Sequence, residues 1–150
     1  MRAREWVSVH GFTLVQILIA ITVLGTAATL SVSGLRAFTA RAELVGAARV
    51  VRGQIGYARA LAAARRERIG LELTPGGDLI LVDARDSVLR RTRLLGADGF
   101  RLDSARIRPA VLRFNPRGQA AAGSVYLHRG NAGLRVVVNF VGRVREERLP

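Results

Sequence analysis

The feature that most constrains this chain is a long stretch without formal charge near its amino end. Residues 12–35 contain no Asp, Glu, Lys or Arg, and most of their side chains are apolar. As a helix this stretch is about 36 Å long at about 1.5 Å per residue, whereas the hydrocarbon core of a bilayer is about 30 Å thick. We therefore expect a membrane-spanning helix over residues 12–35.

The charges beside this stretch predict its orientation. Arg2 and Arg4 precede it, and positive residues favour the cytoplasmic side of a membrane, so the chain from Arg36 onward is expected on the other side. The alternative is a secretory signal peptide cut after the small residues Gly25-Thr26-Ala27 or Thr26-Ala27-Ala28. The apolar part of such a peptide is usually about 7 to 15 residues, so the length favours a retained helix.

A short motif stands at the start of the apolar stretch. The residues are Gly11-Phe12-Thr13-Leu14-Val15-Gln16, followed directly by Ile17-Leu18-Ile19-Ala20. This motif resembles the processing site of type IV pilin-like proteins, which include the pseudopilins of type II secretion. The resemblance implies that a prepilin peptidase removes residues 1–11 by cutting between Gly11 and Phe12, and that the new terminal amine of Phe12 is methylated.

Gln16 departs from the family pattern, because most pilin-like proteins have glutamate at this position. The role usually assigned to that carboxylate is to neutralise the first ammonium group of a neighbouring subunit inside an apolar filament core, where an unpaired charge is costly. Gln16 accepts a hydrogen bond but supplies no charge. Either an amide is sufficient, or this subunit has few copies and sits at or near a filament tip.

After Arg36 the pattern predicts that the helix continues with one apolar face. Apolar residues recur at spacings of three and four, namely Leu44, Ala48, Val51, Ile55, Ala58 and Ala62. Most arginines of this segment lie elsewhere on the helix. We therefore expect one long helix from about Phe12 to about Arg68, with residues 36–68 packed on the domain that the rest of the chain forms.

The remaining chain, residues 69–150, changes to short apolar segments separated by turn residues. The segments expected as strands are residues 69–73, 79–82, 88–94, 111–114, 124–128 and 134–141. They predict an antiparallel sheet covered by the helix, which is an α+β fold. A segment as short as residues 69–150 can bury only a small hydrophobic core by itself. The helix should therefore contribute a large share of the core residues.

Several segments near the carboxyl end narrow the family. They are Phe114-Asn115-Pro116-Arg117-Gly118, Ser124-Val125-Tyr126-Leu127, Leu134-Arg135-Val136-Val137-Val138 and Gly142-Arg143-Val144-Arg145. Together they resemble the C-terminal domain of the GspH/FimT group of minor pilin-like proteins. One branch of that group serves type II secretion, and another consists of minor pilins of type IV pili, some of which bind DNA for natural uptake. The resemblance implies a single-pass protein of the bacterial inner membrane with a periplasmic C-terminal domain.

The charge of the chain gives the DNA branch some support. The sequence has 24 arginines, no lysine and 11 acidic residues, for a net charge of +13 that attracts any polyanion. Gly142-Arg143-Val144-Arg145 resembles the basic signature of that branch, and strand alternation would place Arg143 and Arg145 on one side. With Arg117 and Arg129 from expected loops, they would hold double-stranded DNA by its phosphates. The alternative is a solvated sheet edge, or pairing with Glu146 and Glu147.

Residues for catalysis or metal binding are scarce. The chain has no cysteine, and its two histidines are His10, within the expected leader, and His128. Asp83 and Asp86 flank Arg85 without a further carboxylate nearby, which is typical of a loop rather than a cation site. The sequence therefore favours a structural subunit without metal or cofactor over a soluble enzyme exported by a signal peptide.

Together these observations predict a minor pilin-like subunit of a type II secretion pseudopilus, near its tip, acting in protein secretion across the outer membrane. The alternative is a FimT-like minor pilin of a type IV pilus that binds DNA without sequence specificity during natural transformation. The expected partners are other pilin-like subunits, the prepilin peptidase, inner-membrane lipid, and either secreted proteins or double-stranded DNA.

Overall fold

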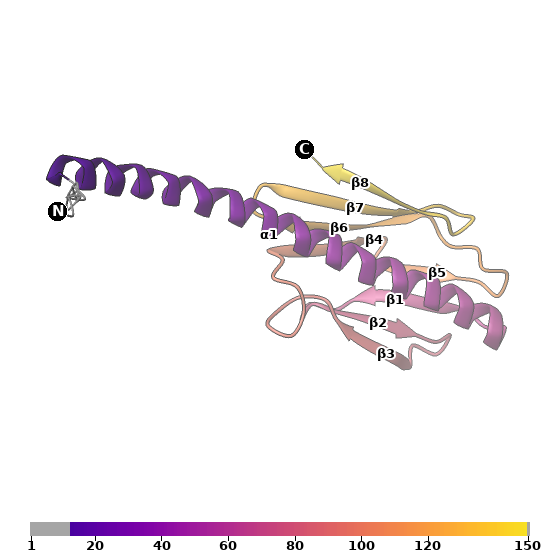
Figure 1. Ribbon diagram of the computed structural model, residues 1–150. Coiled ribbons are helices and arrows are strands. Elements are labelled where there is room, and N and C mark those ends of the chain that lie inside the picture. The colour runs from indigo at the N-terminus through magenta and orange to yellow at the C-terminus, as the bar shows by residue number, and fades with distance from the viewer. Residues whose placement is uncertain (1–12, 150) are drawn as a thin grey trace, which may run out of the picture. The chain divides into compact units, whose positions relative to one another are not determined.

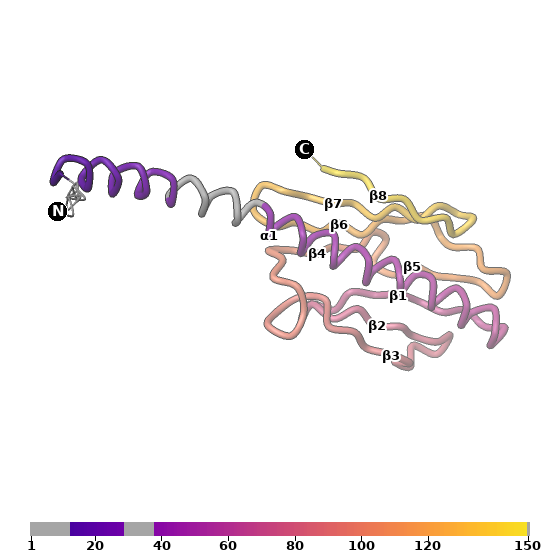
Figure 2. The backbone as a smooth tube through the Cα atoms, viewed as in Figure 1, coloured from indigo at the N-terminus to yellow at the C-terminus, as the bar shows by residue number. Residues whose placement is uncertain are grey.

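The computed structural model describes residues 13–149, without the side chains of residues 29–37. The expected processing residues Gly11 and Phe12 therefore lie outside the described part. Within the described residues, one helix, α1 (Leu14–Arg65), is followed by eight strands (Figures 1 and 2). The chain divides into two compact units, residues 1–37 and residues 38–150.

The first turn of α1 is closed by a reciprocal pair of hydrogen bonds. The backbone N–H of Gln16 donates to Thr13 Oγ1 at 3.3 Å, and the backbone N–H of Thr13 donates to Gln16 Oε1 at 3.0 Å. This is a capping box, in which the residue before the helix and the third helical residue satisfy each other's free backbone donors. Gln16 therefore has a role within its own chain that requires no negative charge.

The helix of the first unit carries exposed apolar side chains. Within the part of the chain that the structure describes, no helix reaches the length and hydropathy needed to cross a membrane. The exposed apolar residues of this unit are Leu14, Val15, Ile17, Leu18, Ile19, Ile21, Val23 and Leu24, each with at least half of its surface exposed. A contiguous apolar surface of this kind marks contact with other molecules.

The second unit contains two four-stranded sheets in place of the single sheet that the sequence predicted. The first has the order β3-β2-β1-β5 and is formed by β1 (Ile69–Leu73), β2 (Asp78–Val82), β3 (Val88–Arg93) and β5 (Val111–Phe114). The second has the order β4-β6-β7-β8 and is formed by β4 (Ser104–Arg108), β6 (Gly123–Arg129), β7 (Ala132–Val138) and β8 (Val144–Leu149). All neighbouring strands are antiparallel, as expected.

Two predicted boundaries were wrong by three residues. The helix ends at Arg65 rather than near Arg68, because Arg66 adopts a left-handed φ of 55° that stops the helical hydrogen-bond pattern. Strand β7 ends at Val138 rather than at Val141, because a turn begins at Asn139.

The predicted apolar face of the helix forms the centre of the core. Leu44, Ala48, Val51, Ile55, Ala58 and Ala62 are all buried, and they join one cluster with residues of both sheets. Residues 38–65 of α1 cross over the two sheets in Figure 1. The prediction that the helix packs on antiparallel strands in an α+β fold is confirmed.

Candidate functional site

Two loops of the second unit are built on the same four-residue pattern. The β5–β6 loop begins with Asn115-Pro116-Arg117-Gly118, and the β7–β8 turn is Asn139-Phe140-Val141-Gly142. In each, the Asn Oδ1 accepts the amide N–H four residues later, from Gln119 at 3.0 Å and from Arg143 at 2.8 Å. Each glycine has a positive φ, 74° and 80°, which only glycine adopts without strain. Asparagine and glycine therefore fix both turns.

A single arginine of the helix joins the two loops. Arg59 Nε donates to the carbonyl oxygen of Gly118 at 2.9 Å, and its Nη1 donates to that of Gly142 at 2.7 Å. Its Nη2 donates to the carbonyl oxygen of Val141 at 3.3 Å. Because all three acceptors are main-chain oxygens, the guanidinium fixes the position of both loop backbones. We call the β5–β6 loop, the β7–β8 turn and Arg59 the loop end.

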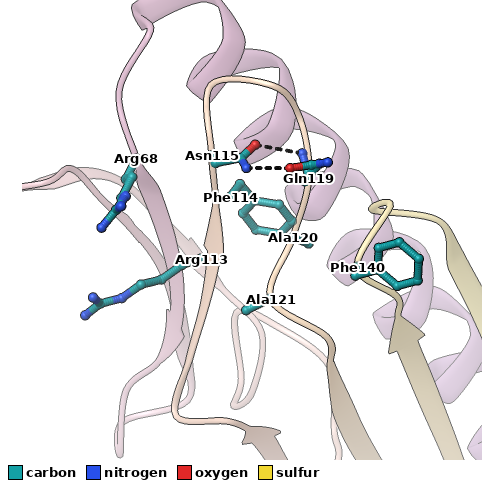
Figure 3. Close-up of a pocket in the computed structure, with 8 residues that line it drawn as sticks. All are labelled: Arg68, Arg113, Phe114, Asn115, Gln119, Ala120, Ala121 and Phe140. Atoms are coloured by element: carbon teal, nitrogen blue, oxygen red, sulfur yellow. Dashed lines mark hydrogen bonds between the residues drawn. The ribbon is translucent and has the colours of Figure 1, made fainter.

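A groove of about 300 Å³ runs along the loop end. It is lined by Arg68, Arg113, Phe114, Asn115, Gln119, Ala120, Ala121 and Phe140. Figure 3 shows Arg68 and Arg113 on one side of the β5–β6 loop and Phe140 on the other. Phe140 is 69% exposed and Val141 is 55% exposed. The loop end thus combines positive charge with an exposed apolar pair, and both suit the contact of another macromolecule.

The structure separates the four arginines that the sequence proposed for DNA. Arg117 and Arg143 are exposed and belong to the two joined loops. Arg145 follows on β8, where it is exposed and pairs in register with Val137. Arg129 ends β6 and pairs with Ala132, at the other end of the β6–β7 hairpin from the β7–β8 turn. The structure therefore places Arg117 and Arg143 in neighbouring loops, Arg145 two residues further along the chain, and Arg129 at the far end of the hairpin.

Arg129 is engaged by a carboxylate of the helix. Its Nη1 lies 2.7 Å from Glu43 Oε1, and the backbone N–H of Arg101 donates to Glu43 Oε2 at 2.5 Å. The hydrogen bond from Arg129, followed by that from Arg101, lowers the pKa of Glu43 below its ordinary value of 4.5. Glu43 therefore links α1 to the end of β6 and to the segment before β4.

Changing Glu43 to glutamine should destabilise the full chain at neutral pH and have little effect in acid. A lowered pKa in the folded state stabilises the protein above the ordinary value of 4.5, and this contribution is lost as pH falls through the lower folded value. Thermal unfolding followed by circular dichroism at neutral and acidic pH measures the difference. Glu146→Gln is the control, because Glu146 has only a long contact to the exposed Arg52 at 3.9 Å. An equal loss of stability at both pH values would contradict the assignment.

Arg59 is among the site residues that the sequence analysis did not single out, as are Phe140 and Glu43. Arg59 directly follows the buried Ala58 and stands four residues after the buried Ile55, so it lies at the border of the apolar face. An arginine at such a border reaches beside the core rather than into open solvent. This border position was the one local indication that Arg59 packs beside the core. The residues that accept its hydrogen bonds could not be inferred, because they lie 59, 82 and 83 residues away along the chain.

Asp83 is bonded within its own turn, and His128 belongs to a strand. Asp83 Oδ1 accepts the amide N–H groups of Ser87 and Arg85, at 2.9 Å and 2.8 Å, and these bonds lower the pKa of Asp83. Among the described residues, no group of three or more potential metal ligands is found. His128 is half-buried on β6, where it pairs in register with Ser104 of β4.

The solved structures to which this chain is similar include a minor pilin and a minor pseudopilin. The type IV minor pilin FimU of Pseudomonas aeruginosa is 26% identical with a TM-score of 0.56, and the match covers 73% of this chain and 92% of FimU. A second crystal form of FimU gives 24% identity and a TM-score of 0.54, covering 69% and 92% of the two chains. The minor pseudopilin EpsH of the Vibrio cholerae type 2 secretion system shares the fold at 12% identity, with a TM-score of 0.51 and coverage of 71% and 97%.

A family model identifies the group. The model described as "Type II transport protein GspH" matches residues 47–142, which is more than half of the chain. The chain therefore belongs to the GspH family of pilin-like filament subunits. A search of curated proteins found no match. The matched segment contains the complete loop-end framework, including Arg59, Gly118 and Gly142.

Proposed function

We propose that this chain is a minor subunit of a type II secretion pseudopilus and acts in protein secretion across the outer membrane. The observation that carries this proposal is the exposed apolar surface of the first half of α1, from Leu14 to Leu24. In a filament, the apolar helices of other pilin-like subunits would bury this surface. The family model is described as a type II transport protein, and that description supports a role in secretion.

The processing and membrane anchoring of the subunit belong to the same proposal. Residues 1–11 would be removed by a prepilin peptidase, and the apolar run of residues 12–35 would hold the subunit in the inner membrane before assembly. Residues 36–68 and 69–150 would then lie in the periplasm. Mass spectrometry of the mature amino terminus should find methylated Phe12, and a terminus beyond Ala27 would instead indicate a cleaved signal peptide.

Two observations support a place near the filament tip. Gln16 is bonded to Thr13 of its own chain and supplies no charge for the terminal amine of a neighbour. The loop end presents the exposed Phe140 and Val141 beside arginines, so it offers a surface to a further subunit or a secreted protein.

A deletion strain tests the proposed function. Export of folded periplasmic proteins should stop, transformation should stay intact, and the wild-type gene should restore export. The variant Leu18→Arg should not restore export, because Leu18 is 63% exposed on the apolar surface and arginine would place a charge there. Arg49→Gln, an exposed change elsewhere on α1, is the matched control and should restore it. Normal export together with lost transformation would refute the proposal.

A second candidate function is DNA binding by a FimT-like minor pilin of a type IV pilus. It is favoured by the loop end, where Arg117 and Arg143 stand in neighbouring loops joined through Arg59. Such a cluster would contact phosphates and bind duplexes of any sequence. The 26% identity to a type IV minor pilin is consistent with this alternative.

A gel-shift experiment with the detergent-solubilised full chain and duplex DNA decides the second candidate. The double variant Arg143→Gln plus Arg145→Gln should abolish the shift. The matched control Arg41→Gln plus Arg49→Gln removes the same charge from exposed positions of α1 and should retain it. Each phosphate contact that a substitution removes should reduce the salt dependence of log affinity by about 0.9. Absence of a shift at low salt would eliminate the DNA function.

A further inference from the structure

The second sheet has an outer face that is rich in arginine. Val125 and Leu127 of β6 are fully buried, so Tyr126 and His128 between and after them belong to the opposite face. The strand register then defines which side chains share that face. We call the following residues the arginine face: Arg106, Arg108, Tyr126, His128, Arg135 and Arg145.

The arginine face is hollowed near the β4 edge of the sheet. A groove of about 450 Å³ lies over the outer face of β4 and β6, and it is lined by Ser104, Arg106, Arg108, Tyr126 and His128. The register pairs Arg106 with Tyr126, so these two side chains leave the sheet at opposite positions of the two strands. Tyr126 and His128 are half-buried. Each has an apolar ring that carries a polar atom, so both apolar and hydrogen-bonding groups line the groove.

The arginines of this face differ in how they are held. Arg135 Nε donates to Ser124 Oγ at 3.0 Å, its Nη1 lies 3.7 Å from Glu147 Oε2, and its guanidinium carbon stands 5.3 Å from the centre of the Tyr126 ring. Arg106 and Arg108 have no carboxylate within ion-pairing distance among residues 13–149, leaving aside the undescribed side chains of 29–37. Two guanidinium groups at the groove are therefore available to an external anion.

The spacing of these two groups indicates the shape of the anion. Arg106 and Arg108 are alternate residues of one strand, so their Cα atoms are about 6.8 Å apart. Alternate residues of an extended peptide have the same spacing. Each guanidinium matches a carboxylate through two parallel hydrogen bonds. An extended segment with acidic residues at every second position would thus pair with both arginines.

The composition of the arginine face favours a protein over single-stranded nucleic acid. Single-stranded nucleic acid binds to rows of aromatic rings, whereas here Tyr126 is the one large ring and Arg135 already packs on it. A second copy of this chain is disfavoured because each copy carries a net charge of +13. We propose that the groove over the outer face of β4 and β6 binds an acidic, extended segment of a partner protein. This site is distinct from the loop end.

A binding experiment tests the proposal with the full chain in detergent. The probe is a fluorescein-labelled peptide of alternating aspartate and threonine, and the matched peptide has asparagine in place of aspartate. Anisotropy should show binding of the acidic peptide at low salt and none of the asparagine peptide. Arg106→Gln plus Arg108→Gln should weaken binding by at least about tenfold. Arg41→Gln plus Arg49→Gln, with equal charge loss on α1, should change it less than about twofold.

Several results would overturn the proposal. Equal weakening in the two double variants would show attraction by net charge alone. Tighter binding of a thymidine oligonucleotide, lost in the Arg106 and Arg108 variant, would assign the groove to nucleic acid. As a second measurement on the unmodified chain, the acidic peptide carrying a benzophenone group should cross-link to β4 or β6. Cross-linking at α1 or at the loop end would refute the location.

Discussion

Replacing Arg59 with methionine should lower the free energy of unfolding by about 3 kcal/mol and loosen the two loops that this arginine joins. The loops would stay linked by the hydrogen bond from the Ala120 backbone N–H to the Phe140 carbonyl oxygen. The substitution removes three hydrogen bonds from a charged donor and leaves the carbonyl oxygens of Gly118, Val141 and Gly142 without that partner. A hydrogen bond to a charged group contributes about 1.5 to 3 kcal/mol, and three bonds from one side chain do not add fully. Methionine retains much of the apolar stem, so the change isolates the guanidinium.

Two measurements on the full chain in detergent test this prediction. Urea unfolding gives the stability, and hydrogen exchange of the Gln119 and Arg143 amides reports on the two turns. Arg49→Met is the matched control, because Arg49 is an exposed arginine of the same helix. If both variants lost the same stability, or if the turn amides stayed protected in the Arg59 variant, the joining role of Arg59 would be wrong.

Replacing Phe114 with alanine should cost about 4 kcal/mol of stability. Phe114 is fully buried and has the largest side chain among the fully buried residues that the structure describes. It belongs to the core cluster that contains residues of the helix and of both sheets. Removing a buried phenylalanine ring loses its transfer free energy and leaves a cavity, at a cost of about 3 to 5 kcal/mol. Because Phe114 also lines the groove at the loop end, the substitution should deform that groove.

Phe140 provides the matched control for this prediction. It lines the same groove but is 69% exposed, so Phe140→Ala should change the stability by less than about 0.5 kcal/mol. Urea unfolding of the two variants measures the contrast. Similar losses for both would show that Phe114 contributes no more to the core than an exposed ring. Unchanged stability for both would contradict the packing of Phe114 itself.

The helix and most strands were predictable because their burial follows a local period. The spacing of Leu44, Ala48 and Val51 identified the buried face, and the structure buries every residue of that face. The two missed strands are β4 and β8, which have weaker patterns. In β8 the sequence Val-Arg-Glu-Glu-Arg-Leu contains no apolar alternation, because an edge strand exposes most of its side chains. The division into two sheets depends on pairings between distant strands, which no local period reveals.

The candidate site was predictable in part. The family resemblance named Arg143 and Arg145, and Arg117 was added because it lies in an expected loop; the structure places all three near one end of the second unit. Arg129 was added for the same reason as Arg117, because it begins another expected loop. Its contact with Glu43 joins residues far apart in the sequence, so no local pattern could separate it from the others. Arg59 was missed for the same reason.

The way Arg59 holds the loops leaves their outermost side chains free to vary. It binds only main-chain oxygens, which every amino acid provides, and each turn depends on its own asparagine and glycine. The two middle positions of each turn, Pro116-Arg117 and Phe140-Val141, contribute no side chain to this framework. These four residues can therefore be substituted during evolution to bind a different partner, while the backbone of both loops keeps its conformation.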